Sequence, residues 1–374
     1  MKRVPIDKIK EGMVINKDVL GINGTMLLYK GYVIENEMLL KKLLLNHDIK
    51  EIEIKSEDSE KIRIANKIKT KIDKNENISK EDLLKIQREL EVTSFKESFE
   101  NVVDHLKTDF QDIIDGKDIE KEKLQERTKI AWDYDNKAFS ILQFISKIKN
   151  ENFSVYAHST NLALISYTIG KWINLDKHQL EELTLSALLS DIGRYKVLEE
   201  LIENIGYNEE KQRELMTKYP KYSYELIQDM NFISKDVKDA VLYHNERYDG
   251  SGYPGILSGD DIPLYARVIA IAMVYDTLTS ETSYRKKNTP FDAIKILETE
   301  YVEKLDIKIL YNFLHRIGSS FVGSEVKLSD GRVGEVVFVP EEGIYKPYIR
   351  IKNTNEILNL NNKEYRNINV IDMI

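Results

Sequence analysis

The segment from His244 to Pro254 holds the residue types that most directly suggest chemistry. It reads His-Asn-Glu-Arg-Tyr-Asp-Gly-Ser-Gly-Tyr-Pro, so a histidine and an amide precede a glycine-rich turn. Two adjacent imidazoles at a helix end could bind one metal ion together, and such a turn could shape a substrate pocket beside it. In this chain the second side chain is Asn245, whose amide is a weak neutral ligand. The segment therefore predicts a pocket whose metal chemistry is impaired.

Several further motifs occur between about residues 150 and 300. The set comprises Tyr156–Ser159, Ala187–Arg194, Lys218–Pro220, Glu246–Pro254, Ala270–Ser280 and Ser283–Lys286. In this order they resemble the HD-GYP family of the HD superfamily, phosphodiesterases that hydrolyse cyclic di-GMP at a centre of two, sometimes three, metal ions in a helical bundle. The resemblance implies an all-α domain with a role in bacterial second-messenger signalling.

The resemblance also identifies the positions that would hold the metal ions. His158, Asp191 and His244 match metal ligands of the family, and Asp191 is the residue that would bridge two ions. Four other ligand positions carry residues of a different type, namely Ser190, Tyr219, Asn245 and Met273. The first three are weak neutral ligands, and a thioether suits Cu(I) rather than the ions used in phosphoryl hydrolysis. We therefore predict a degenerate member of the family with no assigned catalytic residue.

Two outcomes remain open for the three surviving ligands. Two histidines and one aspartate are formally sufficient for a single metal ion with open positions. Because the other four ligand positions are replaced, we expect no tightly bound cofactor and at most one weakly held divalent metal. The other outcome is that His158 and His244 both hydrogen-bond to Asp191 and tie helices together. Three acidic residues outside the motifs could be brought in by folding as replacement ligands: Glu200, Glu203 and Asp261.

Ligand binding can outlast catalysis, because affinity needs ground-state contacts whereas hydrolysis needs groups matched to the transition state. Arg285 is the leading candidate for a phosphate contact, since its segment matches the basic segment that contacts phosphate in the family and a guanidinium can bind phosphate through two hydrogen bonds. Arg194 stands where the family has a lysine. Its guanidinium keeps the positive charge of that position but is planar, whereas the lysine ammonium is compact. The expected ligand-contact residues are Arg194, Arg247, Asp249, Gly252, Tyr253, Pro254, Arg285 and Lys286.

Simpler interpretations apply to some of these residues. The turn could merely cap a helix, and Arg247 could be an ordinary surface charge. Thr282 and Ser283 replace an Arg-Pro pair that is common in the family, which predicts weaker affinity for cyclic di-GMP. Arg267 and Asp276 could pair with each other, brace helices or contact ligand.

Composition limits the class of protein. A chain of 374 residues suits two or three domains, and 42% hydrophobic residues are too many for a disordered chain. The net charge of -8 argues against a nucleic-acid polymer as partner. Cysteine is absent, the start lacks the apolar core of a secretory signal, and no apolar run approaches the roughly 20 residues that span a bilayer. We expect a cytoplasmic protein with no membrane partner.

The elements that must position these residues follow from the hydrophobic pattern. We expect a mainly α protein, in which an HD-superfamily helical bundle is flanked by two small units. Residues 1–56 are predicted to form an α+β domain, with strands at Gly12–Ile15, Thr25–Tyr29 and Lys50–Ile54 and a helix over Glu35–Asn46. Residues 57–126 form a charged, amphipathic helical segment, because apolar residues recur there at helical intervals.

Residues 127–318 are predicted to form the degenerate HD-GYP domain, and residues 319–374 a small C-terminal β appendage. The appendage shows strand-like alternation at Glu325–Leu328, Gly334–Val339 and Tyr348–Ile351, with a hairpin turn at Asp330-Gly331. It contains no cluster of residues that suggests chemistry. Packing or contact with a partner is the expected role of this unit.

The leading functional hypothesis is a catalytically inactive module that binds cyclic di-GMP or docks another protein through the Gly252-Tyr253-Pro254 turn. In the family that turn is implicated in contacts with diguanylate cyclase domains. The alternative is an active cyclic di-GMP phosphodiesterase with a nonstandard, metal-poor site. A homodimer built through helices between Asp82 and Ile114 is compatible with either hypothesis.

Overall fold

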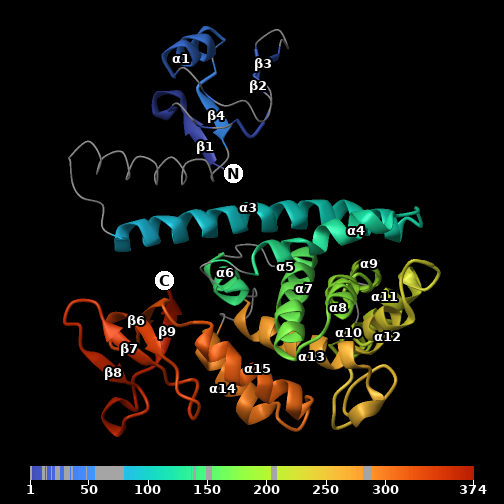
Figure 1. Cartoon of the computed structure of the whole chain (residues 1–374). Helices are drawn as coiled ribbons and strands as arrows, with labels where there is room; N and C mark the ends of the chain where they lie inside the picture. Colours follow the sequence, from blue (N-terminus) through green and yellow to red (C-terminus); the bar gives the residue numbers. More distant parts are fainter. Residues whose placement is uncertain are drawn as a thin grey trace. The chain divides into compact units, whose positions relative to one another are not determined.

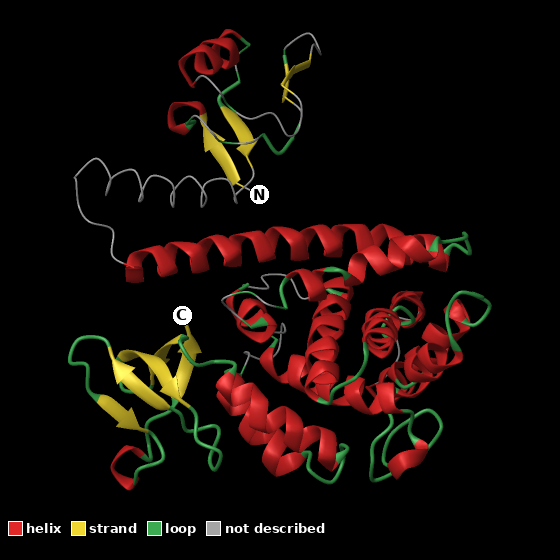
Figure 2. Cartoon of the chain, viewed as in Figure 1, coloured by secondary structure: helices red, strands yellow, loops and turns green. Residues whose placement is uncertain are grey.

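The computed structural model describes residues 2–10, 13, 15–17, 19–21, 26–28, 34, 37–47, 49–54, 80–135, 137, 140–148, 154–203, 209–280 and 288–374. These residues form two compact units, Met1–Glu97 and Ser98–Ile374, and the long helix α3 continues from one unit into the other. Arg285 and Lys286, two expected phosphate contacts, lie outside the described residues, as do Thr282 and Ser283. The described part of the chain is mainly helical (Figures 1 and 2).

The first unit contains the expected small α+β fold, although the unit extends to Glu97, beyond the predicted boundary at residue 56. Its elements are β1 (Lys2–Pro5), a 3-10 turn η1 (Ile6–Lys8), β2 (Val19–Leu20), β3 (Met26–Leu28), α1 (Glu37–Asn46) and β4 (Glu51–Ile54). β1 pairs antiparallel with β4, and β2 pairs antiparallel with β3. Ile52 and Ile54 are buried whereas Glu51 is exposed, which is the alternation of a strand with one face on a core.

The strands of this unit differ from the prediction in three places. β1 and β2 were not predicted, and among the described residues of the expected strand Gly12–Ile15 an isolated bridge joins Ile15 to Ile54. Part of that predicted strand lies outside the described residues. The helix α1 and the strands β3 and β4 lie within the predicted ranges.

Helix α3 (Lys80–Ile114) is a single element of 35 residues, about 50 Å long at 1.5 Å per residue. Its buried side chains recur at intervals of three or four residues: Phe95, Phe99, Val102, Leu106, Phe110 and Ile113. The amphipathic pattern of this region thus buries one stripe of the helix and leaves the rest polar. Leu90, which belongs to the same sequence pattern, is exposed.

The second unit is a bundle of helices that follow α3. They are α4 (Lys121–Thr128), α5 (Ile130–Asp133), α6 (Ile141–Lys147), α7 (Val155–Trp172), α8 (Lys177–Leu189), α9 (Arg194–Glu203), α10 (Glu209–Met216), α11 (Tyr219–Ile227), α12 (Lys235–Tyr243), the 3-10 turn η2 (Gly259–Asp261), α13 (Leu264–Thr279), α14 (Pro290–Glu300) and α15 (Ile307–Ser319). Side-chain caps at Ser154, Asp176 and Ser234 begin α7, α8 and α12.

Helices α7 and α13 lie in the centre of the bundle (Figure 1). Every residue of α7 from Ala157 to Gly170 is buried, and α13 is buried on almost all sides. A helix that is apolar all round belongs inside a protein rather than on its surface. Polar side chains on these two helices are therefore buried and need partners, and the candidate site consists largely of such side chains.

The C-terminal residues form a five-stranded antiparallel sheet in the order β8-β7-β6-β5-β9. Its strands are β5 (Glu325–Leu328), β6 (Val333–Phe338), β7 (Tyr348–Ile351), β8 (Ile357–Asn359) and β9 (Val370–Met373), with a 3-10 turn η3 (Lys363–Tyr365) before the last. The first three strands and the hairpin at Asp330-Gly331 agree with the prediction. β8 and β9 were not predicted, because each is short and carries little alternation. Val326, Val336 and Ile349 share one hydrophobic core with the helices.

Within the described residues, every helix is too short or too polar to cross a lipid bilayer.

Candidate functional site

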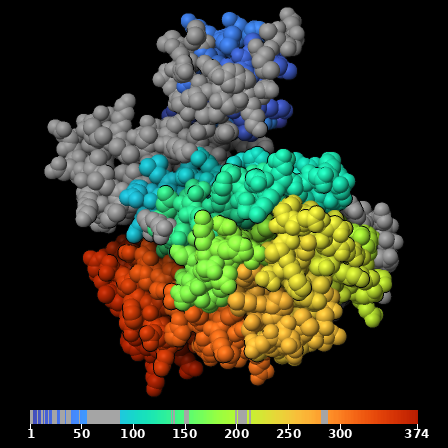
Figure 3. All heavy atoms as spheres, turned by 45° about the vertical axis from the view of Figure 1, so that its right-hand side comes forward, coloured from blue at the N-terminus to red at the C-terminus, as the bar shows by residue number. Residues whose placement is uncertain are grey.

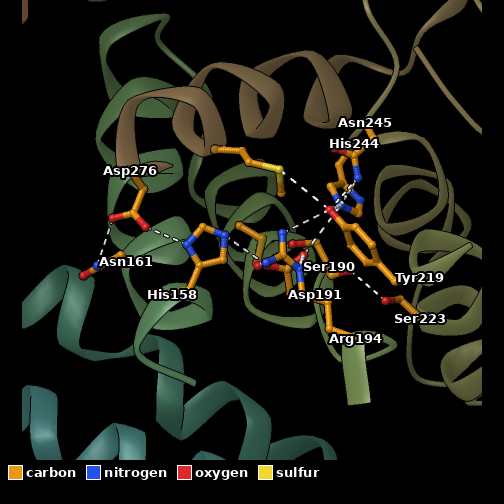
Figure 4. Close-up of polar contacts among 12 residues, drawn as sticks. His158, Asn161, Ser190, Asp191, Arg194, Tyr219, Ser223, His244, Asn245 and Asp276 are labelled. Atoms are coloured by element: carbon orange, nitrogen blue, oxygen red, sulfur yellow. Dashed lines mark hydrogen bonds and ion pairs between the residues drawn. The ribbon is translucent and has the colours of Figure 1, made fainter. Parts of the chain in front are cut away.

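A buried polar cluster lies where the ends of several helices meet (Figure 4). α7 contributes His158 and Asn161, the turn after α8 contributes Asp191, and the start of α9 contributes Arg194. The remaining side chains come from the start of α11 (Tyr219), the residues after α12 (His244 and Asn245) and α13 (Met273 and Asp276). The structure thus gathers His158, Asp191 and His244, the three residues that the resemblance matches to metal ligands, and it brings Tyr219, Asn245 and Met273 into the same cluster.

His158 lies between two carboxylates. Its Nδ1 is 2.6 Å from Oδ2 of Asp276, and its Nε2 is 3.0 Å from Oδ2 of Asp191. Ionised carboxylates only accept hydrogen bonds, so both ring nitrogens face groups that favour a protonated imidazolium. Burial opposes the charge, but the two carboxylates outweigh it and raise the pKa of His158 to about 9. An imidazolium has no lone pair to offer a metal ion.

Asp276 is held from a second side. Nδ2 of Asn161 donates to Oδ1 of Asp276 at 2.9 Å, while Oδ2 accepts from His158. The sequence left open whether Asp276 pairs with Arg267, and the structure shows that it does not. Arg267 instead makes ion pairs with Asp260 and Asp306 at 2.6 and 2.8 Å, where it braces the turn η2 and the start of α15.

Asp191 is approached by two cations. Nε of Arg194 lies 3.1 Å from its Oδ1, and Nε2 of His158 lies 3.0 Å from its Oδ2. Burial alone would raise the pKa of the Asp191 carboxyl, but the guanidinium and the imidazolium overcome burial and hold this pKa far below its usual range. The same attraction raises the pKa of Arg194 against the effect of its burial. Two buried carboxylates are therefore balanced by two side-chain cations.

Tyr219 places its hydroxyl group in the middle of the cluster. The hydroxyl oxygen lies 2.5 Å from Nδ2 of Asn245, 3.1 Å from Nε2 of His244 and 3.8 Å from the sulfur of Met273. The guanidinium of Arg194 lies over the ring, 4.7 Å from its centre. Burial raises the pKa of the phenol, so Tyr219 stays neutral. One phenol thus contacts the side chains at two of the other replaced ligand positions.

His244 is neutral, in contrast to His158. Its Nδ1 donates to the carbonyl oxygen of Val241 at 2.8 Å, because a carbonyl can only accept. Burial lowers the pKa of His244 to about 4, and the nearby Asp191 only partly opposes this. The lone pair on Nε2 then accepts from Tyr219 or Asn245. The expected hydrogen bond to Asp191 is wrong for His244, since the two atoms are 3.9 Å apart.

The turn between α8 and α9 is tied to α11, and this connection brings Arg194 beside Tyr219. The Ser223 hydroxyl donates to the carbonyl of Ser190 at 2.7 Å and accepts from the amide of Gly193 at 2.9 Å. A Cβ on Gly193 would lie 2.3 Å from the carbonyl oxygen of Tyr219, so only glycine allows this close approach. Ser190 itself donates back to Ala187 in α8.

These contacts provide a test of whether the site suits the metal ions that the resemblance implies. The oxygens of Asp191 face two cations, both nitrogens of His158 face carboxylates, and Nε2 of His244 faces a hydroxyl and an amide. Among the described residues, no group of three or more histidine, aspartate and glutamate side chains is arranged to hold a metal ion. In this arrangement the residues present do not fit a bound metal.

The glycine-rich turn beside the cluster is held by Glu246, whose side chain is buried. Its carboxylate accepts from the amide of Gly255 at 2.5 Å and from the amide of Leu257 at 3.1 Å. Ile256, between these two residues, has φ of 56° and a side chain that is 76% exposed. A β-branched residue rarely adopts this left-handed conformation, so the tip of the turn is strained and its apolar side chain faces solvent.

The other expected contact residues of this turn have defined positions. Arg247 donates to the carbonyl of Glu246, and the carboxylate of Asp249 accepts from the amide and hydroxyl of Ser251. A Cβ on Gly252 would lie 2.3 Å from the amide nitrogen of Arg247, so the chain folds back tightly here. Pro254 is exposed and Tyr253 is half-buried. The turn therefore presents Pro254 and Ile256 outward.

The suggested replacement ligands do not join the cluster within the described residues. Glu200 accepts a hydrogen bond from the Tyr222 hydroxyl at 2.8 Å, and Asp261 is exposed in η2. The side chain of Glu203 lies outside the described residues.

Sequence reasoning missed three members of the site. The contact between Asp276 and His158 was not predicted, and no role was predicted for Asn161. Glu246 was included only as part of the Glu246–Pro254 motif, with no role of its own. Asn161 carried a usable signal, because it lies three residues after His158 and so on the same face of a helix. Nothing local in the sequence links His158 to Asp276, which is 118 positions away.

Comparison with known proteins finds a similar domain in the part of the chain that contains the cluster. The family model described as HD domain matches residues 143–309. "Cyclic di-GMP phosphodiesterase PA4108" of Pseudomonas aeruginosa is 28% identical over 205 residues, which cover 55% of this chain and 49% of that protein. "Cyclic di-GMP phosphodiesterase PdeB" of Borreliella burgdorferi is 28% identical over 198 residues, 52% of each chain.

The chain therefore spans about half the length of these curated relatives. Among solved structures, Bd1817, a HDG"Y"P protein from Bdellovibrio bacteriovorus, is similar over 84% of this chain and 98% of its own, with 18% identity and a TM-score of 0.46. The matched residues contain the whole polar cluster and the turn that follows it. Residues 143–309 form an HD domain, which is similar to the cyclic di-GMP phosphodiesterases named above.

Proposed function

We propose that this chain is a catalytically inactive HD-GYP module that binds cyclic di-GMP or docks a protein partner in second-messenger signalling. The observation that carries the proposal is the closed polar cluster, in which Arg194 and protonated His158 balance the two buried carboxylates. Metal ions would supply this positive charge in an active phosphodiesterase. Here the charge comes from side chains of the chain itself.

The energetics of the cluster support the same proposal. A metal ion would have to displace Arg194 from Asp191 and deprotonate His158, whose pKa is about 9. At pH 7 that deprotonation alone costs about 3 kcal/mol, at 1.36 kcal/mol for each pKa unit. The phenol of Tyr219 would also have to leave the lone pair of His244. Metal binding therefore competes with the ion pairs of Asp191 and His158 and with the polar contact between Tyr219 and His244.

The docking role is supported by the glycine-rich turn. Ile256 is 76% exposed and strained, and buried Glu246 holds the amides on either side of it. The left-handed backbone at Ile256 costs free energy, and the exposed apolar side chain that it presents offers a contact to a partner. The partner we propose is a diguanylate cyclase-type domain.

The second candidate function is an active cyclic di-GMP phosphodiesterase with a nonstandard site. The names of the relatives favour it, because two of them are called cyclic di-GMP phosphodiesterases. Against it stand the four replaced ligand positions and the contacts that occupy the three remaining ligands.

One experiment separates the two candidates. The purified chain is equilibrated with cyclic di-GMP and Mn²⁺ across a dialysis membrane, and the bound nucleotide and all recovered products are identified by chromatography. We expect only intact cyclic di-GMP, and well under one metal ion per chain by elemental analysis. A linear dinucleotide product or stoichiometric metal would contradict the proposed inactivity.

Docking needs its own assay, which is titration of the chain with a diguanylate cyclase-type domain followed by calorimetry. Ile256→Glu should abolish the interaction, whereas Ile307→Glu should not, although Ile307 is another exposed isoleucine at 44%. If the chain binds neither cyclic di-GMP nor the cyclase domain, the proposed regulatory role is wrong.

A further inference from the structure

A pocket lies elsewhere in the same unit, away from the polar cluster. Its cavity of about 590 Å³ is lined by three walls: α4 with α5, the first half of α8, and the chain from Asn231 into α12. Figure 3 shows the face on which the surface of α4 (teal) meets that of α12 (yellow). Small-molecule sites occupy roughly 300 to 1,000 Å³, so this cavity has the size of a ligand site.

The lining combines an aromatic floor with cationic groups. Trp132 and Phe232 are half-buried and provide ring surface, and the Trp132 ring packs against Tyr167 with ring centres 4.6 Å apart. Three lysines, Lys121, Lys129 and Lys177, also line the cavity and are exposed. Flat ring surface favours a planar group, and ammonium groups favour an anion.

Two carboxylates decide against a simple anion as the ligand. Glu181 and Glu182 line the same cavity, so three lysines face two glutamates. A bare phosphate would be repelled by these glutamates, whereas a ligand that also carries N–H groups can donate hydrogen bonds to them. The ion pair from Lys177 to Glu181 spans 3.8 Å between exposed side chains, so it is weak and a ligand can replace it.

We propose that this pocket binds a nucleoside phosphate. The base stacks on Trp132 and Phe232, its N–H groups donate to Glu181 or Glu182, and the phosphate pairs with the lysines at the opening. Stacking of a base on an aromatic side chain contributes about 1 to 3 kcal/mol, and the ion pairs add to it. Within a chain of net charge -8, the three lysines supply the local positive charge that an anion needs.

This pocket is separate from the HD site. Helix α8 begins at the pocket with Lys177 and ends beside Asp191, so the two residues are about 20 Å apart at 1.5 Å per residue. None of the residues that line the pocket belongs to the polar cluster. Binding in this pocket therefore does not depend on whether the HD site binds or hydrolyses cyclic di-GMP.

The chain offers a direct optical test, because it has only two tryptophans. In the full-length Trp172→Phe variant, Trp132 is the sole indole, and titration with guanosine monophosphate should quench its fluorescence saturably. In the Trp132→Phe variant, the remaining Trp172 packs against Phe313 and should not respond. Inorganic phosphate, which lacks a base, should leave Trp132 unchanged.

A charge-matched pair of variants identifies the site. Lys121→Gln/Lys129→Gln/Lys177→Gln should weaken binding by about tenfold or more, as expected when several phosphate contacts are lost. The control replaces three exposed lysines elsewhere, Lys308, Lys327 and Lys363, with glutamine and should bind as the parent does. No quenching at about 1 mM nucleotide, or equal weakening in both triple variants, would overturn the proposal.

Discussion

Replacement of Arg194 by methionine tests the idea that this side chain takes over the electrostatic role of a metal ion. Arg194→Met keeps much of the side-chain volume but leaves Asp191 buried with one cation fewer. Removing one partner of a buried ion pair typically costs about 3 to 5 kcal/mol. Since the Arg194 side chain is 21% exposed and His158 still contacts Asp191, we expect the lower end, about 3 kcal/mol.

The assay is urea unfolding followed by tryptophan fluorescence. Trp132 and Trp172 both lie in the second unit, so the signal reports the unit that contains the cluster. The matched control is Lys352→Met in the exposed pair between Lys352 and Glu325, whose atoms are also close at 2.7 Å. Because both partners are exposed, we expect that change to cost under about 1 kcal/mol.

A double-mutant cycle completes the test. Asp191→Asn/Arg194→Met removes both charges, so its cost should be well below the sum of the two single costs. Two results would refute the reasoning. One is a loss below about 1 kcal/mol for Arg194→Met, and the other is additivity of the two changes within about 0.5 kcal/mol.

Asn245→His alone should yield neither a linear dinucleotide nor one bound metal ion per chain, because Asp191 stays paired with Arg194. Detection of the linear product or of stoichiometric metal would contradict this prediction. For His158, the raised folded pKa of about 9 stabilises the protein fully below the ordinary value of 6.5, and the gain is lost as pH rises through 9. Urea unfolding should therefore show that the free energy of unfolding lost in His158→Gln becomes smaller by at most about 3 kcal/mol as the pH rises through that window. A loss that stays constant with pH would contradict the raised pKa of His158. Ile256→Gly should leave the free energy of unfolding unchanged or raise it by up to about 1 kcal/mol, since glycine tolerates the φ of 56°. Marked destabilisation in urea would show that the backbone at Ile256 is not strained. Glu246→Gln should cost about 1 kcal/mol and speed amide hydrogen exchange at Gly255, and unchanged exchange would show that Glu246 does not hold the turn.

Local patterns in the sequence determined most of the elements. The repeat of Phe95, Phe99 and Val102 at helical intervals predicts α3, and the alternation in Glu325–Leu328 predicts β5. Both patterns depend on which residues of one element face the core, so they can be read without knowing its partner. Short strands such as β8 have no such pattern, since their pairing with β7 supplies what their own residues lack.

The sequence by itself also determined which side chains stand at the positions that the resemblance matches to metal ligands, because that is a matter of residue identity. Only the tertiary structure decided which side chains pair with His158 and Asp191. The pairs His158–Asp276 and Arg194–Tyr219 join residues 118 and 25 positions apart, on helices whose packing no local pattern specifies. The physical reason is that a buried charge must find a partner wherever the fold brings one. In this chain the helix ends bring together two cations, two carboxylates and one phenol.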